Sequence, residues 1–255
     1  MKKKIISVFL LLILVFGRSK GVNTIIALIF TCLSIFIVFV PSVISGYNIY
    51  LTSIITAIYI VFMTLIIVYG GNKKSFVAAL GCVAGILLSA ILTLIMANAL
   101  ELTGLLGEDS MHLLYINNDA PIDLRAVIFG SIILGAIGAV MDVSMSIASS
   151  LNELVENMDK PSFSQVIKSG FEIGRDMMGT MSNTLILAYI GSSLSVLLLY
   201  CAYNSSFIYL INKEIIIVEL LQALIGSIGI LTVIPFATFI SAKFYLEDYR
   251  KQSQS

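Results

Sequence analysis

The residue with the clearest chemical potential in this sequence is Asp142, a carboxylate inside the apolar run 124–148. In lipid such a group costs at least ~2.5 kcal/mol, so it requires a partner, water or a proton. In a low dielectric it can bind a proton or a cation in one state and release it in another. The other interpretation is structural, because an aspartate can also join two helices through a salt bridge or a hydrogen bond.

Small and polar residues recur around Asp142 at helical spacing. At about 100° per residue they fall within one sector of a helix, where small side chains let a second helix approach closely. We call this set the Asp142 stripe; it comprises Ser131, Gly135, Gly138, Asp142, Ser146, Ser149 and Glu153. A second stripe, in the run 75–99, is interpreted as structural close packing and comprises Gly81, Gly85, Ser89 and Thr93.

A second polar group opens the apolar run 177–203. Asp176, Thr180 and Asn183 share a helix face at i, i+4 and i+7, and Arg175 precedes them at the cytoplasmic mouth. The helices 124–148 and 177–203 run in opposite directions, so Asp142 and this group can lie at comparable depth. We therefore expect an Asp142–Arg175 pair or an Asp142–Asn183 contact. The alternative for Arg175 is an anchor whose long side chain reaches the membrane interface.

The last apolar run, 215–242, carries Glu219 and Gln222 on the same side as Gly226 and Gly229. Glu219 enters from the outer leaflet, so we expect no direct contact with Asp142. The two acids can mark opposite ends of a polar path, or Glu219 can simply reach water. The predicted intramembrane polar pathway comprises Asp142, Ser146, Arg175, Asp176, Thr180, Asn183, Glu219 and Gln222.

The sequence gives little support to enzymatic or metal chemistry. It has no H-E-x-x-H, G-x-G-x-x-G or Walker pattern. His112 is the only histidine, and Cys32, Cys82 and Cys201 lie in apolar runs without a Cys or His neighbour at metal-ligand spacing. We therefore expect no enzyme, no catalytic residue, no metal and no cofactor. Fifteen Lys and Arg balance fifteen Asp and Glu, which excludes a basic nucleic-acid surface.

The composition predicts the architecture that must position these residues. The 255 residues are 58% hydrophobic and 12% charged, with a mean hydropathy of +1.02, which is too apolar for a water-soluble domain. We predict one integral membrane domain, 1–255, that folds as an all-α transmembrane bundle with about seven spans. The predicted spans are 5–16, 22–40, 49–69, 75–99, 124–148, 177–203 and 215–242.

The loops predict the orientation of these spans. Lys and Arg cluster after 49–69, between 124–148 and 177–203, and after 215–242, which places the C-terminus in the cytoplasm. The first run has only twelve residues, so it either fails to span or puts Lys2 to Lys4 outside, against the rule. Between 124–148 and 177–203, Pro161 and a capping box at Ser162 to Gln165 predict a short amphipathic helix on the cytoplasmic surface.

Two stretches carry a family resemblance. The segment Gly135-Ala-Ile-Gly-Ala-Val-Met-Asp142 and the segment Gly174-Arg175-Asp176 to Asn183-Thr184 resemble the signature stretches of the YibE/F-like membrane protein family. The resemblance adds weight to Asp142, Arg175, Asp176 and Asn183, which stand on the motif positions. Longer members carry an extra N-terminal helix and an outside domain, so this chain resembles a core-only type.

The resemblance implies no established substrate. We expect a permease coupled to protons or cations in a bacterial cell membrane, with a small solute or ion as its cargo. The alternative is a non-transporting membrane subunit or scaffold of an envelope complex. Besides the lipid bilayer, the expected partner is a second family member or a second copy of the chain itself.

Overall fold

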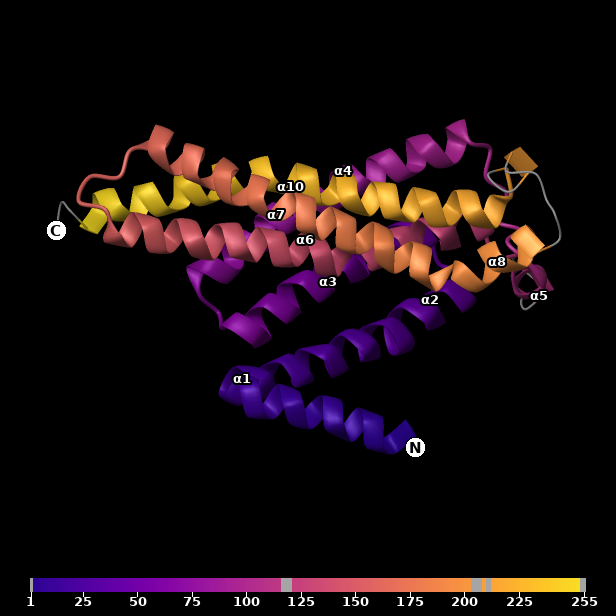
Figure 1. The fold of residues 1–255 in the computed structure, drawn as a ribbon. Coiled ribbons are helices and arrows are strands. Elements are labelled where there is room, and N and C mark those ends of the chain that lie inside the picture. Colours follow the sequence, from indigo (N-terminus) through magenta and orange to yellow (C-terminus); the bar gives the residue numbers. More distant parts are fainter. Residues whose placement is uncertain (1, 116–120, 203–207, 210–211, 253–255) are drawn as a thin grey trace.

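The computed structural model describes residues 2–115, 121–202, 208–209 and 212–252. Within these residues every regular element is a helix, and the long helices lie side by side in one bundle (Figure 1). The elements are α1 (Lys2–Leu33), η1 (Ser34–Phe39, a π-helix), α2 (Val40–Ile44), α3 (Ile49–Tyr69), α4 (Lys73–Ala99), α5 (Glu108–Tyr115), α6 (Leu124–Asn157), α7 (Phe163–Ser192), α8 (Leu194–Ala202) and α10 (Glu214–Gln252).

The two ends of the bundle differ in what they carry. The C-terminus, the α3–α4 turn and the α6–α7 turn lie at one end, which we call the C-terminal end (Figure 1). α2, α5 and α8 lie at the opposite end, which we call the α5 end. This arrangement agrees with the predicted alternation of the loops.

Five stretches are long and apolar enough to cross a membrane. Two predicted spans, 5–16 and 22–40, overlap the single stretch Ser7–Ile44. The run 177–203 is divided at Ser193 between α7 and α8, and its last residue lies outside the described residues. The structure therefore confirms an all-helical membrane protein, whereas the count of about seven spans stays a prediction. The five stretches are Ser7–Ile44, Ile49–Tyr69, Lys73–Ala99, Leu124–Asn157 and Glu214–Lys251.

α1 bends sharply at Arg18, whose backbone angles (φ 48°, ψ −127°) are not helical. The part before Arg18 turns back beside the part that follows and stands away from the bundle (Figure 1). Its apolar side chains are largely uncovered, and Phe16 is 83% exposed. An apolar, uncovered helix of this kind is stable only in lipid or against another protein.

Small residues let α4, α6 and α10 pack closely at the centre. The Ser144 hydroxyl of α6 donates a hydrogen bond of 2.6 Å to the Ala78 carbonyl of α4. A Cβ atom at Gly81 would lie 2.9 Å from the Ala237 backbone, and one at Gly229 would lie 2.7 Å from the Ser89 hydroxyl. The predicted stripe of α4 is therefore a packing surface, as small residues between membrane helices commonly are.

α7 begins where the sequence predicts a helix start but ends much later. Ser162 and Gln165 form the predicted capping box. The short amphipathic helix expected on the surface is wrong as a separate element, because α7 continues without a break to Ser192. The helix continues through Gly170 and Gly174. The absence of a side chain at these glycines lets Thr238 and Ile234 of α10 pack directly against the α7 backbone.

One carboxylate holds the α5 end together. Glu214, the first residue of α10, accepts hydrogen bonds from the Thr103 amide (2.7 Å), the Thr103 hydroxyl (2.6 Å) and the Gly104 amide (2.6 Å). Gly104 has φ +85°, and a Cβ atom there would collide with Leu124. The loop after α4 is thereby fixed to the starts of both α6 and α10.

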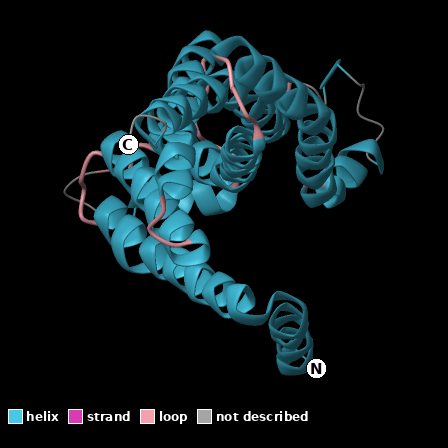
Figure 2. Ribbon diagram, turned by 90° about the vertical axis from the view of Figure 1, so that its left-hand side faces the viewer, coloured by secondary structure: helices cyan, strands magenta, loops and turns pink. Residues whose placement is uncertain are grey.

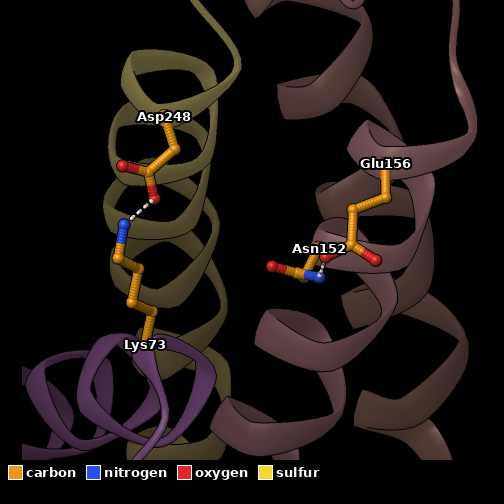
Figure 3. A network of polar contacts seen from close by, with 4 residues as sticks. All are labelled: Lys73, Asn152, Glu156 and Asp248. Atoms are coloured by element: carbon orange, nitrogen blue, oxygen red, sulfur yellow. Dashed lines mark hydrogen bonds and ion pairs between the residues drawn. The ribbon is translucent and has the colours of Figure 1, made fainter. Parts of the chain in front are cut away.

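At the C-terminal end the contacts are polar and partly exposed (Figure 3). Lys73 of α4 forms an ion pair of 2.6 Å with Asp248 of α10. Within α6, Asn152 donates to Glu156 at 2.5 Å. The Lys73 side chain is 73% exposed, so this pair orients the helix ends and adds little stability.

We expect the Glu214→Gln substitution to lower the free energy of unfolding by ~2 kcal/mol, because it removes the charge that receives three hydrogen bonds. Thermal unfolding of the purified protein in detergent measures the change. Glu247→Gln, an exposed carboxylate on the same helix, is the matched control and leaves the stability unchanged. Equal stability of the two variants would contradict the anchoring role.

We expect Gly81→Ala to destabilise the bundle by ~1–3 kcal/mol, since the added methyl group meets the Ala237 backbone, which cannot rotate away. We expect Gly191→Ala in α7 to raise the stability instead. Nothing lies within 4 Å of a Cβ atom there, and alanine favours the helix by roughly 0.5–1 kcal/mol. The same unfolding measurement compares the two, and a loss of stability in both would contradict this packing.

Candidate functional site

α6 is the central helix of the bundle and is surrounded on most of its circumference. It packs against α3, α4, α7 and α10. The side of α6 that carries Val140, Val143 and Ile147 is fully buried among these neighbours. Figure 2, in which the C-terminal end faces the viewer, shows the N-terminal part of α1 standing away from the other helices. One side of α6, which carries Gly138 and Asp142, is exposed.

The Asp142 stripe is this uncovered side. Ser131, Gly135, Gly138, Asp142 and Glu153 are exposed, and Ser146 and Ser149 are half-buried. The predicted clustering on one sector of the helix is thus present. Gln222 and Tyr189 contact it at Ser131 and Gly135, whereas nothing lies within 4 Å of a Cβ atom at Gly138. A polar surface at mid-helix faces outward from the bundle.

Asp142 makes neither of the two contacts expected from the sequence. Within the described residues it has no ion pair and no hydrogen bond, and the contacts with Arg175 and Asn183 are not formed. Its electrostatic neighbours are instead Tyr69 at the end of α3 and Cys82 of α4. The carboxylate is exposed and has no partner within this part of the chain.

The register of α6 and α7 explains why those contacts are missing. Leu151 packs against Gly170, and Gly135 against Tyr189. By interpolation, Arg175 lies ~8 Å nearer the C-terminal end than Asp142, at ~1.5 Å per residue. Asn183 lies close to the level of Asp142 but is turned about 120° away from Tyr189, the residue that contacts α6.

α7 presents its own polar residues outward. Arg175, Asp176, Thr180 and Asn183 are all exposed, as the shared face of the sequence analysis requires. The Thr180 hydroxyl donates a hydrogen bond of 3.0 Å to the Met177 carbonyl, so its hydrogen-bond partner lies within its own helix. The charged and amide groups have no such partner among the described residues.

A second polar cluster joins α6, α7 and α10 nearer the α5 end. The Gln222 amide donates a hydrogen bond of 3.2 Å to the Ser131 carbonyl. The Gln222 side chain also bonds to Tyr189, on which Glu219 acts electrostatically. A Cβ atom at Gly135 would lie 2.5 Å from the Tyr189 hydroxyl, so the glycine makes room for the cluster.

Tyr189 was not identified from the sequence as a site residue. A tyrosine in an apolar run is usually a packing residue, and only the register between α6 and α7 places its hydroxyl beside Gly135 and Gln222. The available signal was weak: Tyr189 follows Asn183 by six positions on a helix already rich in polar residues.

The cluster and Asp142 lie on the same side of α6. Ser131, which receives the Gln222 hydrogen bond, is ~16 Å from Asp142 along the helix axis at ~1.5 Å per residue. Gly135 and Gly138 lie between them, and a Cβ atom at Gly138 would meet nothing within 4 Å. A strip of two glycines therefore separates the Gln222–Tyr189 cluster from Asp142.

Two cavities border α6. One of about 570 Å³ lies at the α5 end, between α5, α6 and α10, and includes Asp109, Ile128 and Ile215. The other, of about 250 Å³, lies between α1, α3 and α6 and is lined by Thr31, Thr64 and Gly138 among mainly apolar residues.

The described residues contain no group of three or more His, Cys, Asp or Glu side chains placed to hold a metal ion. All three cysteines are free; Cys82 is buried, and Cys32 and Cys201 are exposed. The polar groups of the site are thus carboxylates, amides, hydroxyls and one guanidinium, which exchange protons or bind small ions and polar solutes.

Fold and site together define an all-helical membrane protein with polar groups within its membrane helices. The chain belongs to the YibE/F-like protein family, whose model matches residues 5–247, nearly the whole length. This confirms the resemblance carried by the stretches around Asp142 and Arg175. No curated protein and no solved structure matches the chain.

Proposed function

We propose that this protein is a permease for protons or a small cation and that the Asp142 stripe is part of its path. The observation that supports this most directly is the continuous strip on α6 that connects the Glu219–Gln222–Tyr189 cluster to Asp142. Two carboxylates at different depths, with glycines between them, provide two binding stations and space between them.

The charge distribution fits entry of a cation from the α5 end. Glu101, Asp109 and Asp123 lie at that end, and Asp109 lines the 570 Å³ cavity. Lysines such as Lys73 and Lys243 lie at the C-terminal end, which is the cytoplasmic end by the positive-inside rule. The sequence has no ATP-binding pattern, so transport is secondary, passive or driven by a partner protein.

A non-transporting subunit of an envelope complex is the second candidate. The exposed polar surface of α7 favours it, because such a surface in a membrane implies another protein beside it. The two candidates differ in one respect: only the permease gives ion movement when the purified chain is the sole protein in a vesicle.

We expect wild-type protein in proteoliposomes on a solid-supported membrane to give currents after steps in pH or in monovalent cation concentration. In Asp142→Asn these currents fall at least about tenfold, because the substitution removes the charge that binds the ion within the membrane. Glu247→Gln, outside the path, keeps the wild-type currents, and Glu219→Gln reduces them.

Two results would contradict the proposal. Full currents in Asp142→Asn would remove Asp142 from the path. Absence of both current and pH-dye response in wild-type vesicles, with the protein folded and inserted, would favour the subunit.

A further inference from the structure

We infer that a second copy of this chain covers the uncovered side of α6 and α7. The surface, which we call the open face, comprises Gly138, Asp142, Arg175, Asp176, Gly179 and Asn183. The inference concerns assembly, goes beyond the proposed transport and does not depend on it.

The helix glycines identify this face as a packing surface without its partner. Most of them are in tight contact, with atoms of another helix within 3.1 Å of a Cβ position; these are Gly81, Gly85, Gly130, Gly135, Gly170, Gly174, Gly226 and Gly229. Gly138, Gly179 and Gly191 have nothing within 4 Å, and the first two belong to the open face. Glycine in a membrane helix commonly marks a close helix approach, which the described part of the chain does not provide at these two positions.

α7 is too polar to face lipid on this side. It has thirty residues, yet it is not among the five stretches apolar enough to cross a membrane. Only Val166, Gly170 and Gly174 of α7 are buried. At the centre of a membrane an arginine or an aspartate costs at least ~2.5 kcal/mol unless protein or water covers it.

Charge complementarity favours a second copy as the occupant. The open face carries both signs at one level, because Arg175 is directly followed by Asp176. A two-fold axis parallel to the bundle places each residue opposite residues of equal height in the other copy. Arg175 of one copy then faces Asp176 of the other copy at nearly the same height along the axis.

The same symmetry gives Asp142 a partner. Asn183 lies near the level of Asp142 but is turned away from α6 in its own chain, so its amide faces outward. In the other copy an amide at this height can donate to the Asp142 carboxylate. One of the two contacts that the sequence suggests, Asp142 with Asn183, is therefore available between copies, and Arg175 gains Asp176 as a partner in place of Asp142. A foreign protein would have to supply both partners itself.

The experiment measures the mass of the purified chain in detergent and in nanodiscs by light scattering and native mass spectrometry. We expect a dimer for the wild type. In Gly138→Leu and in Gly179→Leu the dissociation constant rises at least about tenfold, because two leucines must enter a close helix contact. Nothing lies within 4 Å of a Cβ atom at either position in the single chain, and at Gly138 the longer side chain enters the cavity between α1, α3 and α6. We therefore expect circular dichroism and the melting temperature to stay at the wild-type values, and a variant that fails this check does not count as a test of the dimer.

Gly191→Leu is the matched control: it is the same change on the same helix, also without neighbours, but turned by about 120° from Gly179. It keeps the dimer. A chain that is monomeric in nanodiscs at all concentrations would overturn the inference, and so would dimers that persist in both Gly138→Leu and Gly179→Leu.

A cross-linking experiment tests the same face in native membranes. In a Cys32→Ser, Cys201→Ser background, Gly179→Cys forms a disulfide-linked dimer on oxidation, whereas Ile95→Cys on the exposed side of α4 does not. Dimers without ion current and without pH-dye response would refute the permease alone, and current from a monomer would refute the pairing alone.

Discussion

The whole structure depends on the absence of water around a membrane helix, because every polar group must then find its partner within protein. In the bundle interior several small hydroxyl side chains meet this constraint by bonding to their own helix. Ser53 donates to the Ile49 carbonyl at 2.7 Å, Thr93 to Ser89 at 2.7 Å, and Ser227 to Ala223 at 2.8 Å. Such groups cost little to bury and leave room for close packing.

Larger polar groups cannot satisfy themselves in this way. A carboxylate, a guanidinium or an amide needs a partner from another element, and Asp142, Arg175 and Asn183 have none among the described residues. All three are exposed, on α6 and α7. The division is physical: hydroxyls and glycines are distributed through the core, whereas the charged and amide groups are kept at a surface where a second protein or water can reach them.

Much of this arrangement follows from sequence pattern alone. The apolar runs predict the long helices, the four-residue spacing of Gly81, Gly85 and Ser89 predicts a packing stripe, and Ser162 with Gln165 predicts the start of α7. These features depend on local periodicity or on a cap, which a single segment contains. The family could also be identified from two short stretches, because they carry its characteristic residues.

What could not be predicted depends on how one helix is placed against another. The spacing puts Asp142 on a stripe, but whether the stripe faces inward or outward is decided by α3, α4, α7 and α10 together. The depth argument brings Asp142 and Asn183 to one level, yet the rotation of α7 turns the amide away. For the same reason Tyr189 was missed: its role depends on contact with Gly135, a residue of another helix that is distant in the sequence.

The open face also connects assembly with transport. A carboxylate exposed to lipid is a poor binding site, since lipid does not solvate its charge. A second copy on that face would exclude lipid, supply an amide donor and leave the glycine strip as a gap between two protein walls. If the copies pair in this way, the path of each α6 is enclosed only in the assembled protein, and the unit that transports is the pair rather than the single chain.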